Sequence, residues 1–205
     1  MEAPSGRRDP TRSEDVTPAA RLFESLRHLY EKLRLRMKKR WDRDLPFDEL
    51  LFDRFQRARN LGFGEGSSVY HNSYVYGDVK VGRSTWIGPF TLLDGTGGLE
   101  IGDWCSISAG VQIYTHDSVK WALSGGKLPY ERSPVRVGNR CYIGSKTVIA
   151  KGVTIGDQCV VGACSFVNKS LPPNSIAAGI PCKVIGTVRT DDEISFHYHQ
   201  VPESS

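Results

Sequence analysis

A histidine stands at the longest break in the regular pattern of this sequence. A six-residue pattern with an aliphatic residue at a fixed place runs up to Ile113, disappears over residues 114–135, and returns in phase at Val137. The stretch "QIYTHDSVKW" opens the break and contains His116. An imidazole can accept a proton near neutral pH, which suits it to general-base catalysis. His116 is therefore the first candidate for chemistry.

The six-residue repeat must provide the scaffold for this histidine. A period of six fits neither an α-helix nor a meander of hairpins. It predicts a chain that turns a corner every six residues and stacks into a prism with parallel sheets as its faces. The aliphatic residue and the residue two positions before it should point inwards, and the glycine that often follows the aliphatic should relax the corner. The aliphatic positions are Val69, Val75, Val81, Ile87, Leu93, Ile101, Ile107, Ile113, Val137, Ile143, Ile149, Ile155, Val161 and Val167.

The cysteines fit the same pattern. Five cysteines without a CxxC pair argue against a disulfide framework and against a zinc site, so no metal is expected. Cys105, Cys141 and Cys159 occupy the small inward position of their hexads. They are expected to be buried core thiols.

Composition limits the other classes of function. A chain of 205 residues accommodates one substantial domain and an appendage. Lys and Arg exceed Asp and Glu by only 27 to 23, too little to indicate nucleic-acid binding. The sequence has no long apolar run and no apolar signal segment at its start, so we expect a cytoplasmic protein.

The repeat lies between an N-terminal appendage and a C-terminal tail. We expect residues 1–20 to be disordered, because they are nearly free of aliphatic residues. Residues 21–62 should form a helical appendage, 63–186 the solenoid with an excursion over 114–136, and 187–205 the tail.

Two helices are predicted in the appendage. Apolar residues from Leu22 to Met37 recur every three or four positions within the basic stretch 21–43, which indicates an amphipathic helix. A second, shorter helix begins after Pro46 and ends near Gly62. These helices either cap an open end of the solenoid, which we favour, or the basic helix rests on an anionic membrane surface.

The repeat and three longer motifs resemble the hexapeptide-repeat acyltransferases, in the branch of galactoside, maltose and xenobiotic O-acetyltransferases. The motifs are "IYTHD" (113–117), "YIGSKTVIAKGVTIGDQCVVGACSFV" (142–167) and "LPPNSIAAGIPCKVIG" (171–186). The chain is most similar in kind to acetyltransferases of bacterial surface-polysaccharide clusters. The resemblance implies an all-β fold, a left-handed parallel β-helix, and acetyl-CoA as co-substrate. It also implies a homotrimer with its active sites between subunits.

The resemblance also assigns roles around His116. His116 matches the family's catalytic histidine, which would take the proton of an acceptor hydroxyl without a covalent acyl-enzyme. Asp94 matches a family aspartate of the acceptor site. Three hexads make one coil, so Leu93 and Ile113 lie one coil apart, and Asp94 can approach His116 at an edge. Asp94 then orients the imidazole or binds a sugar hydroxyl, and Asp117 is a rival for the first role.

The acceptor and co-substrate positions follow from the same resemblance. Trp121 and Tyr130 in the excursion either stack on a sugar ring or pack against the next subunit. The family branch has an asparagine where Ile87 stands and a second basic residue where Gly186 stands. The expected acetyl-CoA positions are Tyr142, Ser145, Ala163, Asn168, Lys169 and Lys183, with the two lysines nearest the phosphates.

The favoured function is O-acetylation of a sugar hydroxyl in surface-polysaccharide synthesis. N-acetylation of a nucleotide-linked amino sugar is the alternative within the same fold. A carbonic anhydrase on this fold needs three histidines, whereas the solenoid contains His71 and His116 only. A further alternative is a non-catalytic scaffold, but the histidine motif and the excursion would then have no role.

Overall fold

The computed structural model describes residues 17–191 and 193–199. The chain divides into two compact units between Leu51 and Phe52, and each is described by itself. Most of the predicted disordered segment, residues 1–16, lies outside the described residues. Its last part, residues 17–20, is not disordered but begins a helix, so that part of the prediction was wrong.

The first unit consists of α1 (Pro18–Trp41) and α2 (Phe47–Leu51). The side chain of Thr17 accepts a hydrogen bond from Ala20 N at the start of α1, and Asp42 ends the helix in the left-handed conformation. Tyr30 of α1 contacts Phe47 of α2 edge-on, with 5.7 Å between ring centroids. Within the described residues, neither helix is long and apolar enough to cross a bilayer.

The second predicted helix is in fact two helices. A new helix, α3 (Arg54–Asn60), starts after α2, because the Asp53 carboxylate accepts hydrogen bonds from Phe55 N and Gln56 N. These amides would otherwise continue the preceding helix, so Asp53 caps a separate one. Helix α3 belongs to the second unit, where it packs on the first solenoid strand and buries Ala58.

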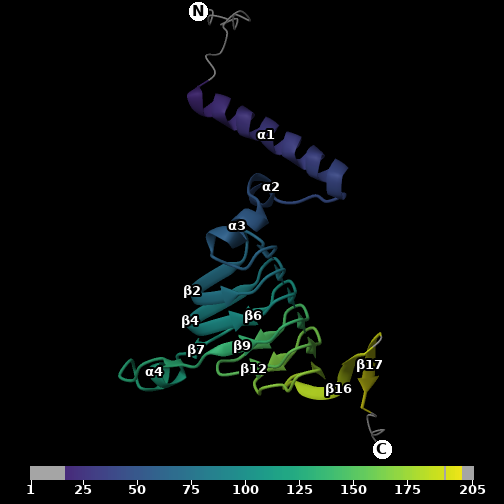
Figure 1. The fold of residues 1–205 in the computed structure, drawn as a ribbon. Coiled ribbons are helices and arrows are strands. Elements are labelled where there is room, and N and C mark those ends of the chain that lie inside the picture. Colours follow the sequence, from purple (N-terminus) through teal and green to yellow (C-terminus); the bar gives the residue numbers. More distant parts are fainter. Residues whose placement is uncertain (1–16, 192, 200–205) are drawn as a thin grey trace, which may run out of the picture. The chain divides into compact units, whose positions relative to one another are not determined.

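The second unit is a parallel β-solenoid with three faces, whose strands stack coil upon coil (Figure 1). Face A contains β1 (Ser68–Val69), β3 (Trp86–Ile87), β5 (Ser106–Ile107), β10 (Tyr142–Ile143), β13 (Val160–Val161) and β15 (Ser175–Ala178). Strands β2 (Tyr74–Val81) and β4 (Leu92–Ile101) each turn the corner from face B to face C. Face B continues with β6 (Gln112–Ile113), β11 (Val148–Ile149) and β14 (Phe166–Val167), and face C with β9 (Val135–Val137) and β12 (Thr154–Ile155).

The predicted inward register is confirmed by the burial of the repeat. All the predicted aliphatic positions are buried except Val75, which is half-buried and packs against the core. Cys105, Cys141 and Cys159 are buried and free of disulfides, as expected for core thiols. One row of inward side chains from each face thus makes a continuous apolar core.

The role predicted for the glycines after the aliphatic residues was wrong. The left-handed corner conformation belongs instead to the residue three positions before the aliphatic, such as Trp104 (φ 59°) and Arg140 (φ 55°). Glycine is needed after the aliphatic because the next coil leaves no room. A Cβ on Gly144 would lie 2.5 Å from Ala163 N and 2.8 Å from the carbonyl carbon of Gly162.

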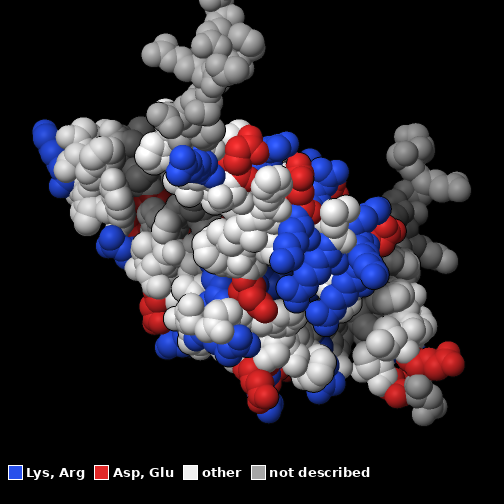
Figure 2. Space-filling model, turned by 90° about the horizontal axis from the view of Figure 1, so that it is seen from above, with Lys and Arg blue, Asp and Glu red and all other residues white. Residues whose placement is uncertain are grey.

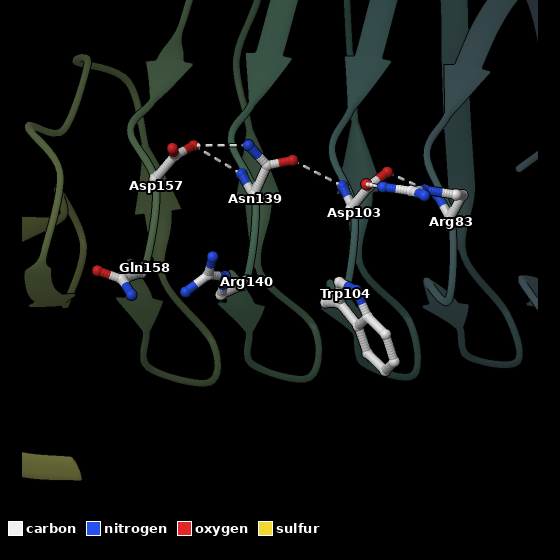
Figure 3. Close-up of a pocket in the computed structure, with 7 residues that line it drawn as sticks. All are labelled: Arg83, Asp103, Trp104, Asn139, Arg140, Asp157 and Gln158. Atoms are coloured by element: carbon white, nitrogen blue, oxygen red, sulfur yellow. Dashed lines mark hydrogen bonds and ion pairs between the residues drawn. The ribbon is translucent and has the colours of Figure 1, made fainter. Parts of the chain in front are cut away.

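The edge between faces C and A is held by a ladder of side-chain hydrogen bonds (Figure 3). Asn139 N donates to Asp157 Oδ1 (2.7 Å), and Asp103 N donates to Asn139 Oδ1 (2.9 Å). At the end of the ladder, the guanidinium of Arg83 forms an ion pair with the carboxylate of Asp103 at 2.9 Å. A shallow pocket beside the ladder has Trp104 among its lining residues. Because its polar side chains bond one another, we assign this edge a structural role.

The described residues of the predicted C-terminal tail form strands. Strand β16 (Lys183–Thr190) runs antiparallel to β15, and β17 (Ile194–Tyr198) runs antiparallel to β16. These strands leave the repeat, as expected, but they extend face A as a sheet. They cover the open edge that a solenoid strand would otherwise present to solvent.

Replacing Gly144 with alanine should lower the free energy of unfolding by about 2–4 kcal/mol, because the added Cβ meets backbone atoms that cannot move aside. Urea denaturation followed by circular dichroism measures this change. Gly125→Ala is the control: it has open space but a φ of +60°, and should cost only about 1 kcal/mol. A Gly144→Ala protein as stable as the native one would contradict the close coil stacking.

Candidate active site

The predicted excursion leaves the solenoid at the edge between faces B and C. Its stem is an antiparallel pair formed by β7 (His116–Asp117) and β8 (Glu131–Arg132), with α4 (Val119–Leu123) between them. Figure 1 shows α4 projecting from the side of the solenoid, next to β7. The chain returns to face C at β9. His116 therefore lies at the base of the excursion, where it joins the rigid coils.

His116 contacts Asp94 across neighbouring coils. The imidazole Nδ1 lies 2.6 Å from Asp94 Oδ2, although the two residues are 22 positions apart in the sequence. Leu93 and Ile113 are register partners in β4 and β6, so the stacking of face B brings the residues that follow them to one edge. The side chain of His116 is one-third exposed, whereas that of Asp94 is buried.

Asp94 is a permanent anion in this setting. Burial by itself would raise its pKa, but hydrogen bonds from Thr96 N (3.0 Å) and Thr115 N (2.9 Å), together with those from Thr96 Oγ1 and His116, outweigh burial and lower the pKa to about 2. The carboxylate contributes to stability above the ordinary aspartate pKa, and this contribution is lost only as the pH falls towards 2. Across the neutral range, His116 thus faces a full negative charge.

This pairing sets which nitrogen of His116 is free. A carboxylate can only accept, so Nδ1–H donates to Asp94. Within the described part of the chain, no residue hydrogen-bonds the other ring nitrogen, Nε2. A neutral imidazole held in this tautomer presents the Nε2 lone pair to any group that binds beside it.

Two threonines that support the pair were missed from the sequence. The hydroxyl of Thr115 donates to the backbone oxygen of Asp94 (2.8 Å) and accepts from Gly97 N (2.8 Å). Thr96 Oγ1 lies 3.0 Å from Nδ1 of His116. The signal for both was the pair of extra residues that lengthens the hexad after Leu93. This insertion forms a bulge in β4 against β2 and brings Thr96 and Gly97 against the next coil.

Asp117 does not contact the imidazole nitrogen. Its carboxylate lies 2.8 Å from Lys151 Nζ, and the same ammonium lies 2.7 Å from Glu131. Asp117 and Glu131 are register partners in the stem, and hydrogen bonds from Lys151 lower the pKa of Asp117. Through these ion pairs Lys151 links both strands of the stem to the next coil of the solenoid. The sequence did not indicate this role.

The two aromatic candidates of the excursion lie over the histidine. Tyr130 stacks on His116 with 6.0 Å between ring centroids and 17° between ring planes. Trp121 meets Tyr130 edge-on at 5.5 Å. Both rings keep about two-fifths of their surface exposed. They wall the site on the side of the excursion.

The predicted acetyl-CoA positions fall on two different edges. Asn168 and Lys169 are exposed at the edge between faces B and C, two coils beyond His116. Ser145 and Ala163 lie at the edge between faces A and B, and the Ala163 side chain is exposed. Within one chain, Ser145 and Ala163 therefore lie on a different edge from His116.

The other predicted positions lie apart from this edge. Tyr142 is exposed on face A, and Lys183 is exposed on β16. Ile87, where the family branch has an asparagine, is fully buried, so its side chain belongs to the core and cannot line the site.

Comparisons with known proteins agree with this architecture. The family model described as "Bacterial transferase hexapeptide (six repeats)" matches residues 134–169. Galactoside O-acetyltransferase of Escherichia coli (strain K12) is 32% identical over 141 residues, which cover 59% of this chain and 68% of the relative.

Solved structures are also similar. A galactoside acetyltransferase in complex with coenzyme A is 27% identical with a TM-score of 0.59, covering 83% of this chain and 84% of the other. AntD, an N-acyltransferase from Bacillus cereus in complex with dTDP and 3-hydroxybutyryl-CoA, is 23% identical with a TM-score of 0.53, covering 66% and 90%, and it shares the fold. The chain therefore belongs to the hexapeptide-repeat transferase family, and it is an acyl-CoA-dependent acetyltransferase built on a left-handed parallel β-helix.

Proposed function

We propose that this enzyme transfers the acetyl group of acetyl-CoA to a hydroxyl group of a sugar, with His116 as the general base. The observation that carries the proposal is the Asp94–His116 pair, in which the carboxylate accepts from Nδ1 and Nε2 has no hydrogen-bond partner among the described residues. One relative, the Escherichia coli enzyme, is named for O-acetylation of a galactoside.

The geometry supports a single direct transfer. Nε2 of His116 takes the proton of the acceptor hydroxyl while the oxygen attacks the thioester carbonyl. The C–S bond then breaks, and the proton on Nε2 passes to the departing CoA sulfur, so that His116 returns to its starting state. During the step the carboxylate of Asp94 stabilises the positively charged imidazolium, because Asp94 keeps its negative charge throughout the neutral range.

The active site is proposed to lie between subunits of a homotrimer. Its support is the separation of Ser145 and Ala163, on one edge, from His116 and Lys169, on another. Acetyl-CoA then lies between the A–B edge of one subunit and the B–C edge of its neighbour. The residues fit such a ligand: Ser145 and Ala163 are small beside a long arm, and Lys169 and Lys183 are exposed cations for phosphates.

The acceptor is proposed to be a sugar of a surface polysaccharide, modified in the cytoplasm. The exposed faces of Trp121 and Tyr130 beside His116 can stack on a sugar ring, and the buried Asp94 is left to orient the base. The likeness in fold to AntD keeps N-acetylation of a nucleotide-linked amino sugar as the second candidate. Thiol release from acetyl-CoA with a panel of sugars and nucleotide-linked amino sugars separates the two: turnover on amino sugars alone would replace the O-acetylation proposal.

His116→Ala should lower kcat by about 10²–10⁴-fold, the usual contribution of a general base. The dissociation constant for CoA should change little, because the predicted CoA positions lie on other coils. Steady-state kinetics and calorimetric CoA titration measure the two effects.

Two aspartates provide the matched controls for His116. Asp94→Asn should lower kcat strongly, since the imidazolium that forms during the step loses its anionic partner. Asp117→Asn removes a neighbouring carboxylate that does not touch the ring nitrogen and should have a smaller effect. Full activity in His116→Ala would show that another group is the base, and equal losses in both aspartate variants would show that Asp94 has no special role beside His116.

Mixing two inactive variants should restore activity if the site is shared between subunits. His116→Ala lacks the base, and Ala163→Trp blocks the edge assigned to the pantetheine arm. After unfolding and joint refolding, random trimers should regain about a quarter of native activity, because some interfaces combine two intact halves.

The control for the mixing experiment is each variant refolded alone, which should stay inactive. Sedimentation velocity of the mixture establishes its oligomeric state. A mixture that remains inactive while forming trimers would place the whole site within one chain.

A further inference from the structure

Helix α1 carries an apolar face that its own unit leaves open. At 3.6 residues per turn, Leu22, Leu26, Leu29, Leu33 and Met37 fall within one narrow stripe. No residue of α1 is buried, and Leu22 keeps 60% of its surface exposed. Contact with α2 is made at Tyr30, on the margin of the stripe. Leu33 and Met37 are half-buried, so the hydrocarbon of the stripe is most accessible at Leu22, Leu26 and Leu29.

Three larger side chains widen the stripe along one margin. Phe23, Tyr30 and Trp41 fall beside the leucines when the helix is viewed down its axis. Phe23 keeps 65% of its surface exposed and Trp41 keeps 60%. Aromatic residues of this kind are enriched where an apolar interior meets water. We name the stripe together with these three residues the apolar face of α1.

The charges of α1 are sorted around this face. Helix α1 contains eight Lys or Arg residues and two Glu residues. Arg27, Arg34 and Lys38 fall along one flank of the apolar face, and Arg21, Lys32, Arg36 and Lys39 fall along the other. Glu24 and Glu31 fall opposite the apolar face. Cations thus border the hydrocarbon on both sides, and the two glutamates are farthest from it. The eighth cation, Arg40, falls within the stripe itself, in the last turn of the helix.

The two basic flanks differ in their partners. On the first flank, Arg27 pairs with Glu24 (2.9 Å), Arg34 with Asp44 (3.1 Å) and Lys38 with Asp42 (2.5 Å). Among the described residues, no ion pair is formed by the four cations of the second flank. Figure 2 shows Lys and Arg side chains gathered in a broad patch on the face seen from above, and the last turns of α1 are rich in them. The four cations of the second flank thus have no compensating carboxylate among residues 17–191 and 193–199.

We propose that the apolar face of α1 lies in the interface of an anionic membrane, with the helix parallel to the surface. Such a surface supplies hydrocarbon below the helix and phosphate groups along both flanks at once, and long Lys and Arg side chains reach the phosphates from the margins. Glu24 and Glu31 then face water. This proposal concerns where the enzyme is held and does not depend on the identity of its acceptor.

A second copy of α1 fits the face less well. Paired along the leucine stripe, two copies would place Lys32 and Lys39 at the margins of the seam, where like charges repel. Glu24 and Glu31 would lie outside the seam, too far around the helix to pair with them. Arg36 and Arg40 would enter the seam itself. The charge layout therefore favours an anionic surface over self-association.

Co-sedimentation of the full chain with lipid vesicles tests this proposal. The protein should bind vesicles of phosphatidylcholine mixed with phosphatidylglycerol and should bind phosphatidylcholine alone much more weakly. Replacing Arg21, Lys32, Arg36 and Lys39 with glutamine should weaken binding to the mixed vesicles at least about 100-fold, since each surface cation contributes roughly fivefold. Glutamine keeps helix propensity, so the fold is not at risk.

The matched control removes the same charge from the solenoid. Lys80→Gln, Arg83→Gln, Arg136→Gln and Arg140→Gln together should leave vesicle binding nearly unchanged, and circular dichroism should show intact helix in both variants. Leu26→Gln with Leu29→Gln should also abolish binding. The proposal is overturned if the α1 variant and the solenoid variant bind the mixed vesicles equally well. It is also overturned if the native protein does not bind anionic vesicles. A third contradicting result is that the leucine changes reduce the oligomeric mass but leave vesicle binding unchanged, which would assign the apolar face of α1 to contact with a second copy.

Discussion

The close stacking of successive coils is the constraint on which the rest of this structure depends. Each coil donates backbone hydrogen bonds to the next, as from Gly144 N to Val161 O (2.8 Å) and from Gly162 N to Ala177 O (2.8 Å). Neighbouring coils then approach so closely that only glycine fits after many of the aliphatic residues. This stacking allows only one register between neighbouring strands, so each inward side chain has a fixed position. The core and the edges are therefore defined together, and an edge can hold two side chains at a set distance.

The candidate site uses that property directly. Asp94 and His116 are distant in sequence, but consecutive levels of face B place them 2.6 Å apart. The scaffold supplies the buried, ionised carboxylate, and the excursion supplies the imidazole and its aromatic wall. Lys151, from the following coil, holds both strands of the excursion's stem. Reactive groups thus stand on rigid elements, and the irregular segment that shapes the acceptor side is anchored at its base.

Much of the fold could be predicted from the sequence because the repeat is itself a physical pattern. The inward register, the buried cysteines and the approach of Asp94 to His116 all follow from a period of six and three hexads to a coil. Other features depend on atoms that a period does not describe. The need for glycine at position 144 arises from Ala163 in the next coil, the support from Thr96 arises from a local insertion, and the ion pairs of Lys151 require the path of the excursion. The end of the helix before Asp53 depends on a single capping carboxylate, and the strands after Lys183 lie outside the repeat.

The proposed mechanism requires that Asp94 fix the tautomer of the His116 imidazole in which Nδ1 carries the proton and the free lone pair is on Nε2. Long-range ¹H–¹⁵N correlation spectra of histidine-labelled protein measure this most directly, with His116→Ala to assign the signals. At a pH where the ring is neutral, we expect a protonated Nδ1 and an unprotonated Nε2 for His116, and a shift towards the other tautomer in Asp94→Asn. A native enzyme with its proton on Nε2 would contradict the account, because that nitrogen would then have no lone pair to receive the proton of the acceptor.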